Sequence, residues 1–399
     1  MATLAWPTLD QQIRLEAAAV DGRLVAKNLV TTRAGGVAAA LAARPLVDVP
    51  ALLPRLFPLC GAAHAAASLA AIETALRVEV SPAQTAFRDL LLLAEHGASV
   101  AWRILMDWPP LIGEPVQVRA CADIRRAAAA INAGAQGGQW ARIGGAKLRP
   151  DRDELRRAVQ ALALMLRGLF PEANARSLSA LEAKIAAGTG TPARTISLAR
   201  RDLASYGAHD LPRLASMNAD WFAARFAAQP DFSDAPTRDG TPAEVGALAA
   251  QRHALAAEAL VSWGPALATR LLAAALDAHV VAERLSRTLD RLGDADPAAA
   301  DLTQTGHGAG VVETARGPLA YFIETADGRV RTLRSVAPTE WNFHTQGPFM
   351  AALAAAPRVA DPVFAARLLA ASFDPCVPFA IDAVPADRSP SHAEPALDA

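Results

Sequence analysis

One cysteine near the end of the chain stands in backbone that cannot be helical. Cys376 lies between Pro375 and Pro378, which fix their own backbone angles and stop a helix from running through them. A thiol aimed by so stiff a turn could be a metal ligand or a reactive group. A lone free cysteine is most often a small buried hydrophobic residue, however, so this segment alone does not define a site.

A second cysteine, far upstream, stands in a similar setting. Cys60 lies between Pro58 and Gly61, and His64 follows four residues later in the first turn of an expected helix. A thiolate is a soft donor that suits transition metals such as iron. A thiol enzyme using Cys60 and His64 is the weaker reading, because their spacing supplies no oxyanion hole and no third group to orient the histidine. Cys121 stands on an expected helix with no motif around it, and we expect it to be structural.

Composition excludes several classes of protein. The chain has 399 residues, of which 52 % are apolar and only 5 % aromatic, which favours close-packed helices. The 39 basic side chains nearly balance the 40 acidic ones, so we expect neither nucleic acid nor a membrane surface as a partner. Three cysteines do not make a disulfide framework. With no bilayer-length apolar run and no signal-peptide pattern, the chain is expected to be cytoplasmic.

Two hairpins and several helices should position these cysteines. Asp-Gly pairs between alternating apolar runs predict hairpins at the two ends of the chain, and long apolar stretches predict buried helices. Thr241-Pro242-Ala243-Glu244 has the pattern of a helix start, whereas glycines 306, 308 and 310 predict a loop. The hairpins are expected over residues 13–32 and 319–333, and the helices over 64–77, 82–106, 151–170 and 241–292, with a break at residues 264–265.

The segment from Arg55 to Glu73 resembles, without a gap, the first cysteine motif of nickel-iron hydrogenase large subunits. That motif reads Arg-x-Cys-Gly-x-Cys, with His-Ala-x-Ala-Ser beginning four residues after the second cysteine. Cys60 and His64 match the second cysteine and the histidine, but Phe57 stands in place of the first cysteine.

Ser372-Phe373-Asp374-Pro375-Cys376 resembles the C-terminal motif of the same family, Ser-Phe-Asp-Pro-Cys-x-x-Cys-x-x-His. Cys376 matches its first cysteine, whereas Phe379 and Asp382 replace the second cysteine and the final histidine. Further segments continue the resemblance, which is strong over residues 13–110 and 311–382; they are residues 313–318, 338–342, 347–349 and 359–362.

The resemblance implies a mainly α (α+β) fold, the hydrogenase large-subunit helical bundle with small N- and C-terminal β elements. We expect a single domain of this kind over residues 1–383 and a disordered tail over residues 384–399. The differences from the family motifs oppose a catalytic role. The family holds nickel with four thiolates, whereas this chain keeps only one cysteine of each pair. Ser99 also falls near the position of a family aspartate beside the metal.

The pattern is similar to the hydrogenase assembly proteins of the HupK/HoxV type. This resemblance implies a non-enzymatic scaffold in hydrogenase maturation that transiently holds an Fe(CN)₂CO fragment on Cys60 and Cys376, without nickel. It implies that Arg316 and Thr339 donate hydrogen bonds to the two cyanides and that His64 hydrogen-bonds the Cys60 sulfur. The implied partners are hydrogenase maturation chaperones and the large-subunit precursor.

Other readings of the same residues stay open. The two cysteines could be packed thiols in a metal-free protein that mimics the large subunit and binds maturation chaperones. Arg316 could instead pair with a carboxylate such as Asp374, Thr339 could be a turn hydroxyl, and His64 could be an ordinary helix-start residue. A hydrogenase subunit with unusual metal ligation is a further alternative, which the two phenylalanines oppose.

Overall fold

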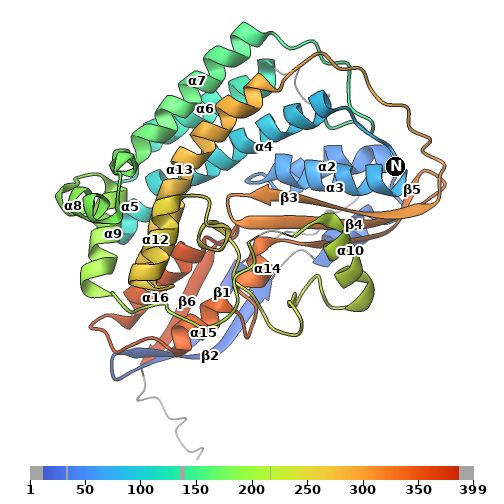
Figure 1. Cartoon of the computed structure of the whole chain (residues 1–399). Helices are drawn as coiled ribbons and strands as arrows, with labels where there is room; N and C mark the ends of the chain where they lie inside the picture. Colours follow the sequence, from blue (N-terminus) through green and yellow to red (C-terminus); the bar gives the residue numbers. More distant parts are fainter. Residues whose placement is uncertain (1–11, 33–34, 135–139, 216, 386–399) are drawn as a thin grey trace, which may run out of the picture.

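The computed structural model describes residues 12–32, 35–134, 140–215 and 217–385. Four long helices form a bundle on one side of the molecule (Figure 1), where α13 packs against both α7 and α4, and α6 packs against the same two helices. They are α4 (Pro82–Trp102), α6 (Val118–Gly134), α7 (Arg152–Leu169) and α13 (Leu267–Asp290). The fold is mainly α with small sheets, as the sequence predicts.

The bundle helices begin where the sequence places their caps. The side chain of Ser81 accepts a hydrogen bond from the backbone of Gln84 at the start of α4, and Asp151 caps α7 in the same way. Helix α13 is buried along most of its length because its small and apolar residues cover nearly every side. The long helix predicted over residues 82–106 continues through a π-helical turn, η2 (Arg103–Asp107), into α5 (Trp108–Leu111).

A three-stranded antiparallel sheet lies beside helix α3 (Gly61–Ala75). It is formed by β3 (Gly306–Thr314), β4 (Gly317–Ala326) and β5 (Arg329–Val336) in that order. The predicted loop at Gly306–Gly310 is wrong, since these residues belong to β3. A Cβ on Gly308 would lie 2.5 Å from the backbone of α3, so alternate glycines allow the strand to pack directly on the helix.

A second sheet joins the two ends of the described chain. The predicted N-terminal hairpin forms β1 (Gln12–Val20) and β2 (Arg23–Thr32), with Asp21 and Gly22 at positive φ in its turn. Strand β6 (Phe379–Pro385) pairs with β1 in parallel, which gives the order β2-β1-β6. Residues 384 and 385 are therefore in a strand, and the rest of the tail predicted to be disordered lies outside the described residues.

The helix start predicted at Thr241–Glu244 is also wrong. Glu244 is buried and lies in extended backbone, where its carboxylate accepts hydrogen bonds from Arg270 at 2.8 and 3.0 Å and lies 3.0 Å from His209. The helices of this region begin later, at α11 (Ala247–Ala250) and α12 (Ala254–Trp263), and the break at Gly264–Pro265 is confirmed. A tertiary ion pair thus overrides the local capping pattern.

Shorter helices fill the space around the two sheets and the bundle. They are α1 (Gly35–Leu41), η1 (Leu46–Asp48), α2 (Val49–Leu56), η3 (Pro171–Asn174), α8 (Leu178–Ala187), α9 (Thr191–Asp202), α10 (Ala219–Ala228), α14 (Pro338–Asn342), α15 (Pro348–Ala354) and α16 (Pro362–Phe373). Within the described ranges, no helix combines the length and apolar character needed to cross a bilayer.

Candidate functional site

Cys60 is the residue that precedes helix α3. Helix α2 ends at Leu56, and the intervening turn is closed by a hydrogen bond from the Cys60 amide to the Phe57 carbonyl at 3.2 Å. The carbonyl of Cys60 then accepts the first bond of α3, from His64 at 3.0 Å. The turn therefore fixes the backbone of a half-buried thiol at the N-terminal end of a helix.

Cys376 is placed by the end of helix α16. Asp374 adopts a left-handed conformation with φ 51° and ends the helix, and Pro375 then prevents its continuation. The half-buried sulfur of Cys376 lies 3.2 Å from the hydroxyl of Thr339, and the Cys376 amide donates to the same hydroxyl at 3.4 Å. Thr339 is thus in hydrogen-bond contact with Cys376, and its predicted hydrogen bond to a cyanide stays a prediction.

Arg316 lies within electrostatic reach of both cysteines. It is 9 % exposed and stands in the turn between β3 and β4. Burial opposes its charge, but Asp374, Cys376 and Cys60 raise the pKa of its guanidinium above the ordinary value. Three segments that are far apart in sequence therefore meet at one buried cation.

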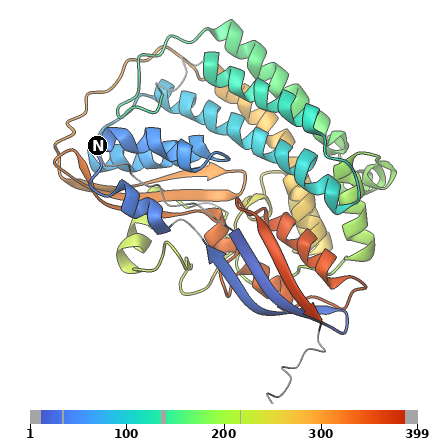
Figure 2. The same ribbon diagram turned by 180° about the vertical axis from the view of Figure 1, so that it is seen from behind.

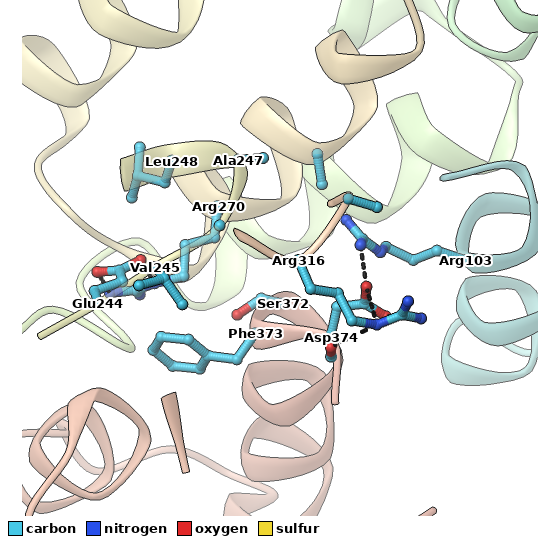
Figure 3. A pocket seen from close by; sticks show the side chains of 13 residues that line it. Arg103, Glu244, Val245, Ala247, Leu248, Arg270, Arg316, Ser372, Phe373 and Asp374 are labelled. Atoms are coloured by element: carbon cyan, nitrogen blue, oxygen red, sulfur yellow. Dashed lines mark hydrogen bonds and ion pairs between the residues drawn. The ribbon is translucent and has the colours of Figure 1, made fainter. Parts of the chain in front are cut away.

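Arg316 also pairs with Asp374, which was the alternative reading of this arginine. Its Nε donates to the Asp374 carbonyl at 3.2 Å and lies 3.0 Å from the carboxylate. Arg103, on η2, forms a second buried ion pair with this carboxylate, so Asp374 bridges two arginines (Figure 3). Sequence reasoning missed Arg103, although a basic residue inside an apolar helical stretch was a signal.

The two phenylalanines that replace family cysteines are packed in aromatic contacts. Phe57 stacks on His64 with ring centres 3.8 Å apart, and the His64 Nδ1 lies 2.7 Å from the Tyr321 hydroxyl. Phe379 contacts Phe349 and Phe343 at centroid distances of 5.3 and 5.9 Å. The contact with Tyr321 gives the His64 ring a defined orientation. The hydrogen bond predicted between His64 and the Cys60 sulfur stays a prediction.

Two openings lead to this cluster. A cleft of about 540 Å³ reaches Cys376, Arg316 and Asp374, and a smaller cavity of about 150 Å³ is lined by Glu95, Ser99 and Arg316. Ser99 and Arg316 therefore line the same cavity, and the predicted place of Ser99 beside a bound metal stays a prediction. A third space of about 20 Å³ is lined by Arg316, Arg103 and Arg270, among other residues (Figure 3).

Glu95 is an acidic residue that sequence reasoning did not single out. It stands on α4, and its carboxylate accepts hydrogen bonds from the backbone amides of Ala62 and Ala63 at 2.7 and 3.0 Å. Burial raises its pKa to about 7, although those amides and Arg316 favour its charged form. The residue thus ties α4 to the first turn of α3, directly after Cys60.

The remaining cysteine has the structural role expected from sequence. Cys121 lies on α6, is 3 % exposed, and has a thiol pKa raised by burial. Within the parts of the chain that the structure describes, no group of three or more His, Cys, Asp or Glu side chains could by itself hold a metal ion.

A hydrogenase expression/formation protein HupK from Rhizobium leguminosarum bv. viciae is 30 % identical to this chain over 345 residues. The match covers 84 % of this chain and 86 % of that protein. This chain belongs to the HupK family. A HoxV expression/formation protein from Cupriavidus necator is 28 % identical over 365 residues and is covered to 89 %.

This chain shares its fold with hydrogenase large subunits. A family model described as nickel-dependent hydrogenase matches residues 227–382. The reduced nickel-iron-selenium hydrogenase of Desulfomicrobium baculatum superposes with a TM-score of 0.66, covering 90 % of this chain and 95 % of that chain at 16 % identity. The large-subunit-like fold expected from the motifs is confirmed, whereas the named HupK and HoxV relatives are expression/formation proteins.

Proposed function

We propose that this protein is a non-catalytic scaffold in nickel-iron hydrogenase maturation. It transiently holds an Fe(CN)₂CO fragment before the fragment is transferred to the large subunit. Membership of the HupK family supports the maturation role. The cleft that Cys376 shares with Arg316, an arginine that is also within electrostatic reach of Cys60, is the observation that supports the iron fragment as cargo.

The donor set fits a fragment that carries its own ligands. Iron(II) with two cyanides is neutral, so two thiolates give the bound fragment two negative charges. A buried cation offsets part of this charge in surroundings where water cannot. Arg316 supplies that cation, and its guanidinium also has the donor geometry to hydrogen-bond a cyanide nitrogen. Thr339, already bonded to Cys376, would serve the second cyanide.

The two phenylalanines make nickel an unsuitable cargo. Phe57 and Phe379 occupy the positions where two further thiolates would be needed, and both rings are in stacked or edge contacts. A four-thiolate site cannot form without them. Two protein donors also hold a metal less firmly than four, which suits a carrier that must release its cargo.

The proposed partners are maturation chaperones that deliver the fragment and the large-subunit precursor that receives it. The cleft that reaches Cys376 gives such a partner access to the site. A metal-free interaction protein is the second candidate function. It is favoured by the Arg316–Asp374 ion pair, because a guanidinium that already has a carboxylate partner needs no anionic cargo.

The decisive experiment is infrared spectroscopy of protein purified without oxygen from cells that make the maturation machinery. Bound carbon monoxide and cyanide absorb where proteins do not. The parent and the Cys121→Ala control should show these bands with about one iron per chain. Cys60→Ala and Cys376→Ala should lack them. A blank parent spectrum from protein that still supports hydrogenase maturation would exclude the iron scaffold and favour the metal-free protein.

A further inference from the structure

Strand β6 has one unpaired edge in the described chain. It is the outer strand of the sheet β2-β1-β6, with β1 as its hydrogen-bonded neighbour (Figure 2). The Ile13 amide donates to the Pro378 carbonyl at 2.9 Å, and Ile13 lies opposite Phe379. In a parallel ladder alternate residues face the same neighbour, so the backbone groups of Phe379, Ile381 and Ala383 face outward.

This edge begins in the wall of the cleft. Val377, Pro378 and Phe379 line the cleft immediately after Cys376, so the free strand edge and the cleft are continuous. Further lining residues come from α4, η2 and α5: Trp102, Met106, Pro110 and Leu111 are apolar, and Asp107 is acidic. Leu59, next to Cys60, adds an apolar side chain that is 42 % exposed.

One cation on the cleft wall has no charge partner. Arg367 is exposed on α16, and the structure gives it no ion pair or hydrogen bond within the ranges it describes. Arg316, deeper in the same cleft, is by contrast paired with Asp374. An incoming carboxylate would therefore be attracted to Arg367 rather than to the interior of the site.

We propose that an extended segment of a partner protein adds a strand to the outer edge of β6. The segment places an apolar side chain in the cleft and an acidic side chain against Arg367. Backbone hydrogen bonds to the edge strand supply affinity, and the cleft supplies specificity. The choice of the hydrogenase large-subunit precursor as this partner rests on the proposed function. Docking here would bring the partner directly beside Cys376.

The test measures binding of the purified large-subunit precursor to the full-length protein. Ala383→Pro removes an outward amide and leaves the ladder with β1 intact, because proline is tolerated where the strand edge faces solvent. Arg367→Glu reverses the unpaired charge. Each change should weaken binding about tenfold or more, while Arg367→Lys and the remote Arg287→Glu stay within about twofold of the parent. Matching circular dichroism and melting temperatures establish that the variants fold.

Hydrogen exchange gives a second reading of the same interface. The amides of Phe379 and Ile381 should become protected when the precursor is added to the parent, and should stay exposed with Ala383→Pro. The proposal is overturned if the parent does not bind the precursor or if both variants bind as tightly as the parent. It is also overturned if the parent self-associates and Ala383→Pro abolishes that association, because the edge then receives a second copy.

The cysteine variants separate this proposal from the iron scaffold. Cys60→Ala removes a proposed metal ligand and leaves the β6 edge and Arg367 unchanged. Precursor binding that survives in Cys60→Ala, together with absent infrared bands in every protein, would retain the docking edge and exclude the iron cargo. Intact infrared bands, together with precursor binding that neither Ala383→Pro nor Arg367→Glu weakens, would retain the iron cargo and exclude the docking edge.

Discussion

Arg316 donates a hydrogen bond from Nε to the Asp374 carbonyl and lies 3.0 Å from the carboxylate of the same residue. Because Asp374 ends α16 two residues before Cys376, this pair fixes the arginine to the turn that presents the sulfur. The arginine that we propose as a cargo ligand and the residue that shapes the cysteine turn are thus held in one ion pair.

Arg316→Lys should retain the charge and lose the fork of donors. A lysine cannot serve Asp374 and a cyanide at once from fixed directions, so cargo bands should weaken or shift. Loss of the buried charged hydrogen bonds should also lower the free energy of unfolding by about 1.5–3 kcal/mol. Infrared spectra and urea denaturation measure the two effects. Unchanged cyanide bands would contradict contact between Arg316 and the cargo.

Arg103→Ala should destabilise the fold more than any exposed arginine does. Its removal leaves Asp374 buried with a single cation, and breaking a buried pair typically costs about 3–5 kcal/mol. Arg287→Ala is the control, because Arg287 pairs with Glu283 on the surface of α13 and should cost under about 1 kcal/mol. Equal losses in the two variants, measured by denaturation, would contradict the bridging role of Asp374.

Gly308→Ala should disrupt the packing of β3 on α3. The new Cβ would lie 2.5 Å from the carbonyl oxygen of Ala71 and from the amide nitrogen of Ala75, so the strand must move away from the helix, at a cost of about 1–3 kcal/mol or more. Gly168→Ala provides the matched control, because Gly168 is exposed on α7 with open space around it and should be neutral or slightly stabilised. Thermal melting distinguishes the two.

Glu95 should make stability depend on pH. Its pKa in the folded protein is about 7, above the ordinary 4.5, so the folded state holds this proton more tightly than the unfolded state. Raising the pH from about 4.5 to about 7 therefore lowers the contribution of Glu95 to stability, and further increases leave it unchanged. Glu95→Gln should lose this part of the pH dependence. The measurement compares urea midpoints of parent and variant across that range.

Local sequence patterns predicted the elements whose signals are local. The Asp-Gly hairpins, the Asp151 cap and the break at Gly264–Pro265 each depend on a few neighbouring residues, and each is present. The family motifs likewise pointed to Cys60, Cys376, Arg316 and Thr339, which the fold brings to one region.

The errors arise where distant residues decide the structure. The glycines of β3 have the composition of a loop. Their small size is needed because helix α3 packs directly on the strand, and that contact cannot be seen in the local sequence. Thr241–Glu244 has the local pattern of a helix cap. The residue that actually pairs with Glu244 is Arg270, which is distant in sequence and so could not enter that prediction. Arg103 and Glu95 belong to no short motif, and their importance depends on a turn and a helix end contributed by other segments.

The parallel pairing of β1 with β6 has a consequence for biosynthesis. Strand β1 can pair with β6 only after nearly all of the described chain has been synthesised, and Cys60 can meet Cys376 only at the same stage. Contacts between such distant segments form late, because the intervening chain must be ordered before they can close. A nascent chain in which the Cys376 segment has not yet been synthesised therefore lacks the complete pair of thiols, however much of the helical bundle has already formed.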